Sequence, residues 1–199
     1  LAENSQYFEK VAVANTALTT GDSIFTVGEN FSRWQDFAAN SPNFNIGQFI
    51  QRGTFRNLSE AEVAAYNAPF PTETHKVGAR TMPQLVPTTP NDPASEANRR
   101  AWATLSELEI PFLTLYSDLN TVGQEFEQYF QQIVPGAADQ PHRLLRNGEH
   151  FLQEDNGEEL SQILSCFFSN LGQDCLRGEI VFNDPLIEYA ASYQAMPKD

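Results

Sequence analysis

The sequence predicts an α/β fold, in which a parallel sheet is flanked by helices and a helical insertion interrupts the alternation. Three short apolar runs are typical of buried strands, and they cover residues 11–14, 111–116 and 142–145. Segments with helical spacing separate these runs, and such an alternation indicates a parallel sheet. The stretch from about residue 28 to 90 instead predicts small helices joined by prolines, without a strand.

The insertion is predicted from aromatic spacing and a helix-capping signal. Aromatic side chains recur every three residues between positions 31 and 37, as on one face of a helix. Ser59 and Glu62 form a capping box, because each side chain can satisfy a free backbone amide of the other residue. The prolines that follow must end this helix, and one more short helix is expected over residues 72–82.

Three helices are predicted after the insertion. The first begins with Asp92 as its N-cap and Pro93 at the first helical position. The second covers about residues 126–133 and the third about 158–169. The tail contains a candidate strand at 180–182 and a candidate helix after it, and neither has an assigned place in the sheet.

These elements divide the chain into four segments. Residues 1–22 hold the first core strand, 23–90 form the helical insertion, 91–170 form the rest of the core, and 171–199 form the tail. With 199 residues the chain is long enough for one ordinary domain with a substantial core.

The composition excludes some classes of partner. Lys and Arg total 12 against 26 Asp and Glu, which gives a formal charge of −14. An acidic surface repels nucleic acid and anionic membranes, so we expect neither as a partner. No apolar run approaches the ~18 residues of a membrane span, and we expect no signal peptide. Two cysteines, Cys166 and Cys175, are too few for a disulfide framework, so a reducing, cytoplasmic location is expected.

Two ionisable residues follow predicted strands and are candidates for catalysis. Asp118 comes directly after the second strand, and His150 follows the third after a short turn. Ligands of parallel sheets bind outside the carboxyl ends of the strands, so an acid and a base there could act as a pair. The simpler alternative is that Asp118 is a turn or capping residue and that His150 lies in a surface loop.

Other chemical motifs are absent from the sequence. His75, His142 and His150 lack the spacing of metal ligands, and no phosphate-binding glycine loop occurs, so no metal or cofactor is expected. A nucleophile on a tight strand-to-helix turn would need the pattern G-x-[SDC]-x-G, which does not occur in these 199 residues.

Several runs together resemble one family, the haloalkane dehalogenases. The resemblance extends from about Leu1 to Phe168 and depends on several motifs in the right order. The motifs are Phe31-x-x-Trp34, Leu58-Ser59-Glu60-Ala61-Glu62, Ala65-Tyr66-Asn67-Ala68-Pro69-Phe70-Pro71, Gly78-Ala79-Arg80, Pro83-Gln84-Leu85-Val86-Pro87, Pro111 to Asp118, and Gly148 to Glu154.

This resemblance implies the C-terminal half of an α/β-hydrolase fold, with the insertion as a helical cap. The implied reaction is the hydrolytic cleavage of carbon–halogen bonds, without a cofactor, through an alkyl-enzyme ester on an Asp nucleophile. His150 would activate the water that hydrolyses the ester, Asp118 would orient His150, and Trp34 would donate its indole N–H to the leaving halide. The residues that would line the dry substrate pocket are Phe31, Phe70 and Pro71.

The resemblance also implies that part of the active site is missing. The nucleophile, the second halide donor and the oxyanion loop of this family would precede Leu1. We therefore expect this chain alone to be inactive, and to be soluble only with a partner, such as a missing N-terminal half, or as an oligomer. The expected small molecules are a haloalkane substrate, water and the halide product.

Two other interpretations remain open. The chain could come from an epoxide hydrolase or an esterase of the same fold, in which case Tyr66 is a candidate for protonating the epoxide oxygen. It could also be a non-catalytic remnant or a binding module, with an acidic surface and a tail that serve a partner. The halide-donor role implied for Trp34 favours the dehalogenase.

Overall fold

The computed structural model describes residues 1–169. They divide into a first unit from Leu1 to Glu158 and a second unit that begins at Glu159. The predicted strand at 180–182, the helix after it and the tail segment 171–199 lie outside the described residues.

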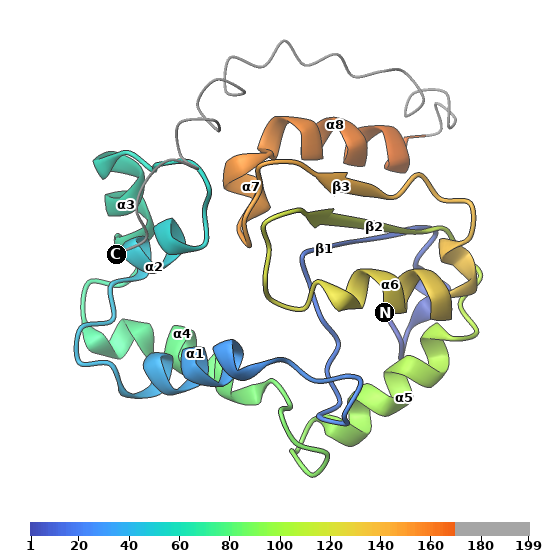
Figure 1. Cartoon of the computed structure of the whole chain (residues 1–199), viewed down its shortest axis with the longest axis horizontal. Coiled ribbons are helices and arrows are strands. Elements are labelled where there is room, and N and C mark those ends of the chain that lie inside the picture. Colours follow the sequence, from blue (N-terminus) through green and yellow to red (C-terminus); the bar gives the residue numbers. More distant parts are fainter. Residues whose placement is uncertain (170–199) are drawn as a thin grey trace. The chain divides into compact units, whose positions relative to one another are not determined.

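The sheet of the first unit has three parallel strands, in the order β1-β2-β3 (Figure 1). They are β1 (Val11–Ala14), β2 (Phe112–Ser117) and β3 (Arg143–Leu145). All three coincide with predicted strands, and the parallel α/β fold is confirmed. Every residue of the central strand β2 is buried, which explains why its sequence contains no charged residue and does not alternate between core-facing and solvent-facing positions.

The insertion between β1 and β2 is helical throughout. Ser59 and Glu62 form both bonds of the predicted capping box. The helix expected over residues 72–82 is instead split into short pieces, and Pro83, which has no backbone N–H, lies where the last of them tightens into a 3₁₀ turn. The elements are α1 (Glu29–Asn40), α2 (Ile46–Arg52), α3 (Glu60–Asn67), η2 (Glu73–Lys76), α4 (Val77–Thr81) and η3 (Met82–Leu85).

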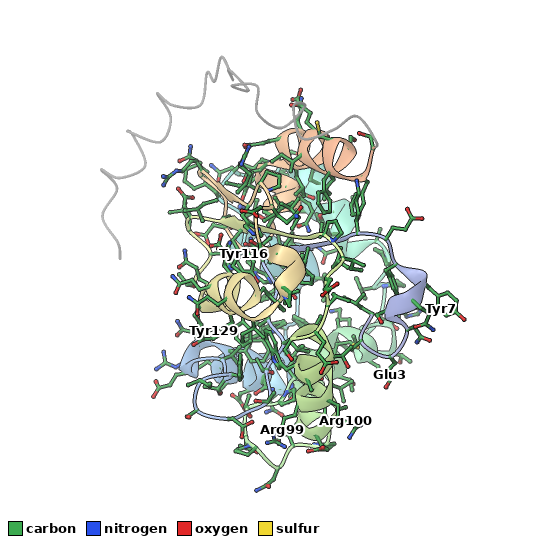
Figure 2. All side chains as sticks on the ribbon, turned by 90° about the vertical axis from the view of Figure 1, so that its right-hand side faces the viewer. Glu3, Tyr7, Arg99, Arg100, Tyr116 and Tyr129 are labelled. Atoms are coloured by element: carbon green, nitrogen blue, oxygen red, sulfur yellow. The ribbon has the colours of Figure 1, made fainter. Side chains whose placement is uncertain are left out.

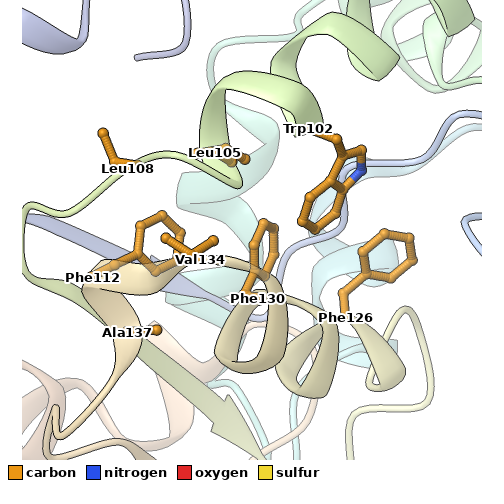
Figure 3. Packing of buried hydrophobic residues seen from close by; sticks show 8 residues of the cluster. All are labelled: Trp102, Leu105, Leu108, Phe112, Phe126, Phe130, Val134 and Ala137. Atoms are coloured by element: carbon orange, nitrogen blue, oxygen red, sulfur yellow. The ribbon is translucent and has the colours of Figure 1, made fainter.

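An aromatic core packs the helices α5 (Ser95–Leu105), α6 (Glu125–Ile133) and η4 (Pro135–Ala137) around the amino end of β2. Trp102 stacks on Phe130 with 5.0 Å between ring centroids, and Phe130 contacts Phe112, the first residue of β2 (Figure 3). The core therefore occupies the amino end of the central strand and leaves its carboxyl end to other residues. The first unit also contains η1 (Ser5–Tyr7) and α7 (Leu152–Asp155), which contribute no buried residue to this core.

Helix α5 also holds the turn through which the chain leaves the sheet for the insertion. The amide of Asn98 donates to the carbonyl of Thr19 at 2.7 Å, and Arg99 Nε lies 2.9 Å from Asp22 Oδ2. Figure 2 shows Arg99 beside Arg100 on this helix. The entry to the insertion is thus fixed by α5, which is distant from it in sequence.

Helix α5 begins later than the sequence predicts. Its first residue is Ser95, and Asp92 is not its N-cap. The carboxylate of Asp92 instead accepts the backbone N–H groups of Thr88 and Thr89, at 2.7 and 2.8 Å. The side chain of Asp92 therefore stabilises the turn before the helix and does not cap α5.

Helix α8 (Gly157–Phe168) coincides with the helix predicted over about residues 158–169, and its buried residues are Leu160, Ile163, Cys166 and Phe167. Cys166 is disulfide-bonded, so it does not support the reducing location that the cysteine count predicts. Within residues 1–169, every helix is too short or too polar to cross a membrane.

Candidate active site

The carboxyl ends of β1 and β2 are joined by a pair of polar side chains. Asn15 follows β1 directly and has a positive φ of 39°, a conformation that Asn tolerates better than most residues. Its Nδ2 atom donates to Ser117 Oγ at 2.7 Å, and its Oδ1 atom accepts the Ser117 backbone N–H at 2.9 Å. Both residues are buried, so this pairing fixes the two strand ends to each other.

The same pair holds the loop that carries His150. Asn15 Nδ2 also lies 2.9 Å from the Glu149 carbonyl and 3.1 Å from the His150 carbonyl. Ser117 Oγ donates to the Glu149 carbonyl at 2.7 Å. The backbone of His150 is therefore anchored at the carboxyl edge of the sheet, as its position after the third strand predicts.

The imidazole of His150 is half-buried and has one polar partner among the residues that the structure describes. Its Nδ1 atom lies 3.2 Å from Oδ1 of Asn120, a side chain that is only 1% exposed. Burial lowers the pKa of His150 and so favours the neutral ring. The Nε2 atom makes no hydrogen bond to any residue that the structure describes, so it is available to accept a proton from a bound water.

Asp118 does not pair with His150 among the described residues, contrary to the expected acid–base pair. Its backbone N–H donates to the Leu145 carbonyl at 3.0 Å, which continues the β2–β3 pairing by one residue. Its carboxylate accepts the Gly148 N–H at 3.4 Å and lies 3.6 Å from Arg146 Nη1. The extended pairing turns Asp118 toward the β3 turn, and the structure pairs His150 with Asn120 instead.

Asp155 links the His150 loop to the helical insertion. Its carboxylate accepts three backbone N–H groups, from Phe55 at 2.9 Å, Arg56 at 3.0 Å and Glu149 at 2.9 Å. Two of these amides belong to the segment between α2 and α3, and the third directly precedes His150. A single carboxylate on α7 therefore sets the position of the insertion relative to the candidate base.

A second link between the insertion and α7 is an ionic cluster around Arg56. Arg56 Nη2 lies 2.7 Å from Glu62 Oε1 and also contacts Glu154. The hydroxyl of Tyr66 donates to the other Glu154 oxygen, and this hydrogen bond raises the pKa of Tyr66 to about 12. The Tyr66 proton is thus already engaged, which argues against its use as an acid toward an epoxide.

A row of aromatic rings connects His150 to Trp34. The His150 and Phe151 rings are 5.1 Å apart, and Phe151 contacts Phe49 edge-on at 6.1 Å. Phe49 then stacks on Trp34 at 3.8 Å with an interplanar angle of 13°. The indole N–H of Trp34 donates to no residue in the described part of the chain, so it can serve an external acceptor.

The other predicted pocket residues lie in different surroundings. Phe31 is half-buried and lines a hollow of about 230 Å³ together with Val122 and Gly123, just beyond Asn120. Phe70 is half-buried and Pro71 is exposed. Their role as pocket lining stays a prediction. No group of three His, Cys, Asp or Glu side chains within residues 1–169 is arranged to hold a metal ion.

Gly148 leaves no room for a side chain between β2 and α7. A Cβ atom there would lie 2.8 Å from the Ser117 Cβ and 2.3 Å from Asn156 Oδ1. Such distances are shorter than van der Waals contact, so we expect Gly148→Ala to displace the His150 loop and to destabilise the protein by about 1–3 kcal/mol. Urea unfolding should show a lower midpoint, whereas Gly78→Ala, at a helical position of α4 with open space, should raise the stability by about 0.5–1 kcal/mol. Equal midpoints for the two variants would contradict this account.

Comparison with known proteins identifies the class of this fold. The chain superimposes on haloalkane dehalogenase DpaA from Paraglaciecola agarilytica, described as a tetramer, with a TM-score of 0.67, 23% identity and coverage of 81% of this chain and 53% of that one. The comparison with a loop variant of the haloalkane dehalogenase DbeA from Bradyrhizobium elkanii gives a TM-score of 0.68 and 22% identity. It covers 83% of this chain and 60% of that one. The described chain therefore has the fold of the C-terminal part of an α/β-hydrolase.

Sequence comparison gives the more particular result. The chain is 48% identical over 167 residues to a haloalkane dehalogenase of Psychrobacter cryohalolentis, covering 84% of this chain and 54% of that protein. It is 40% identical to a haloalkane dehalogenase of Mycolicibacterium paratuberculosis, and this match covers 81% of this chain and 52% of that protein. No family model matches. The resemblance to haloalkane dehalogenases is thus confirmed, and the chain spans about half the length of the curated relatives it matches.

Proposed function

We propose that this chain supplies the general base and the helical cap of a haloalkane dehalogenase, and that the nucleophile comes from outside these 199 residues. The observation that carries the proposal is His150, whose backbone is held at the carboxyl edge of the sheet and whose Nε2 atom has no hydrogen-bond partner within residues 1–169. Support for the substrate class comes from the curated relatives, which are named haloalkane dehalogenases. We call the chain together with its nucleophile-bearing sequence the complete enzyme.

The proposed reaction has two steps. A carboxylate nucleophile attacks the carbon that bears the halogen, so that a carbon–oxygen bond forms, the carbon–halogen bond breaks, and halide leaves. Water then attacks the ester carbonyl while His150 Nε2 takes one of its protons. The carbon–oxygen bond between the ester carbonyl and the alcohol oxygen breaks, the alcohol oxygen takes the second proton of the water, and the alcohol leaves. The carboxylate is restored, and His150 releases its proton to solvent. His150 suits the second step because burial keeps its imidazole neutral and able to accept that proton.

Trp34 is proposed to stabilise the leaving halide through its indole N–H. A donor of this kind acts on charge that develops only as the carbon–halogen bond breaks. Two features support the assignment, namely the free N–H of Trp34 and the aromatic row that joins it to the His150 loop. An epoxide hydrolase or esterase has no need of a halide site, so halide binding distinguishes the alternatives.

Halide binding can be assigned to one of the two tryptophans by fluorescence. We expect bromide or iodide to quench the tryptophan emission of the complete enzyme saturably, and Trp34→Phe to weaken halide binding, because it removes one of the two expected halide donors. Trp102→Phe is the matched control, because the Trp102 indole is buried and already donates to the Leu18 carbonyl at 2.8 Å. A halide affinity in Trp34→Phe equal to that in Trp102→Phe would remove Trp34 from the halide site.

A further inference from the structure

We propose that Asn120 is the positioning residue for His150 and that its amide oxygen holds the imidazole in the Nδ1–H tautomer. The inference deepens the proposed function, since its catalytic consequence rests on His150 being the base. The contact itself stands on geometry, because His150 Nδ1 lies 3.2 Å from Asn120 Oδ1 and Asn120 is almost completely buried.

The orientation of the Asn120 amide is determined by a neighbouring residue. The Val122 backbone N–H donates to Asn120 Oδ1 at 3.2 Å, and Asn120 Nδ2 donates to the Val122 carbonyl at 3.0 Å. A reversed amide would bring two donors together at the Val122 N–H and two acceptors together at its carbonyl. Both bonds would be lost at a buried site, so the oxygen must be the atom that faces His150.

The tautomer of His150 follows from this orientation. An amide oxygen can only accept, so the proton of this hydrogen bond must come from Nδ1 of the imidazole. A neutral imidazole carries one N–H, and therefore Nε2 keeps its lone pair. In serine proteases, by contrast, exchanging the orienting Asp for Asn produces the wrong tautomer and a large loss of activity. Here the bonds to Val122 prevent that outcome.

An amide orients the ring without adding negative charge beside it. Two carboxylates lie near this pair along the chain: Glu149 directly precedes His150, and Asp118, two residues before Asn120, is directed at Gly148 and Arg146. Neither carboxylate makes a hydrogen bond to the His150 ring within the described part of the chain, and burial is the cause of the lowered pKa of His150. The ring of His150 also contacts Phe151, which is uncharged. The Asn120 amide therefore stabilises the charged imidazolium less than a carboxylate in the same place would. A carboxylate at position 120 should favour the imidazolium and so raise the pKa of His150.

The tautomer can be measured by long-range ¹H–¹⁵N NMR, which distinguishes protonated from unprotonated ring nitrogens. The chain has three histidines, and one of them is an internal control. His142 Nδ1 accepts the Thr114 N–H at 3.0 Å, and its Nε2 lies 2.8 Å from the Ala137 carbonyl, so His142 must be the Nε2–H tautomer. We expect His150 to be the opposite Nδ1–H tautomer at neutral pH. His150 in the Nε2–H form, or in a mixture, would overturn the proposal.

Three variants separate positioning from simple structural support. Asn120→Ala should convert His150 to a mixture of tautomers, and Asn120→Asp should raise its pKa by about one unit or more. Asp118→Asn should change neither property. A pKa of His150 that responds to Asp118→Asn and not to Asn120→Asp would overturn the assignment, even if Asn120→Ala fails to fold. The tautomer and the pKa of His150 can be measured without catalytic turnover. These results would therefore stand even if the dehalogenase proposal failed.

Discussion

Replacing His150 with glutamine is expected to stop turnover of the complete enzyme after one release of halide per active site. Glutamine cannot take the proton of the attacking water, so the alkyl-enzyme ester should accumulate. Loss of a general base typically lowers the rate of the step by about 10²–10⁴-fold. Halide release would be followed over time, and mass spectrometry would detect the added alkyl group on the nucleophile-bearing segment.

The matched control for this experiment is His75→Gln. His75 is exposed and contacts Thr72 through Nδ1 at 2.8 Å, far along the chain from the strand ends. We expect this variant to keep normal turnover. Continued multiple turnovers in His150→Gln, at a rate similar to that of His75→Gln, would show that another group activates the water.

Replacing Asp155 with alanine is expected to give the largest loss of stability. The change removes the acceptor for the backbone amides of Phe55, Arg56 and Glu149, and part of this site is shielded from water. Hydrogen bonds to a charged group contribute about 1.5–3 kcal/mol each and are not additive, so we expect a loss of about 3 kcal/mol in the free energy of unfolding. Urea unfolding of the purified protein measures this value.

A surface aspartate provides the comparison for Asp155. Asp36 is exposed on α1 and accepts a hydrogen bond from Asn40 at 2.8 Å, so Asp36→Ala should change stability by less than about 0.5 kcal/mol. The His150 ring should also become less ordered in Asp155→Ala, because Glu149 loses its anchor. Equal unfolding free energies for the two variants would show that Asp155 does not hold the insertion and the loop together.

The position of the candidate base could be predicted from the sequence, but its partner could not. His150 follows a short apolar strand, and the carboxyl ends of parallel strands meet at one edge of a sheet. A search for an acid after the second strand finds Asp118, whereas the residue beside the imidazole is Asn120, a neutral amide two positions later. Which of the two residues faces His150 depends on how far the β2–β3 pairing extends. The structure shows that it extends to Asp118, because the backbone N–H of Asp118 donates to the Leu145 carbonyl.

For the other residues of the site, too, a position could be recognised in the sequence more easily than a hydrogen-bond partner. Asn15 stands directly after the first predicted strand, so its place was a detectable signal, although its bonds to Ser117 and to the His150 carbonyl join positions more than a hundred residues apart. Asp155 gave no signal, because a carboxylate that binds backbone amides has no sequence motif.

Local chemistry in the sequence determined the three strands, the helical insertion, the capping box at Ser59 and the edge of the sheet where His150 lies. These features depend on the order of apolar and polar residues over a few turns of chain, which the sequence states directly. The tertiary structure alone decided the partner of His150, the link through Asp155 and the late start of α5. Each of these is a choice among competing hydrogen-bond partners, and the choice is made by which backbone groups folding brings within about 3 Å of a side chain.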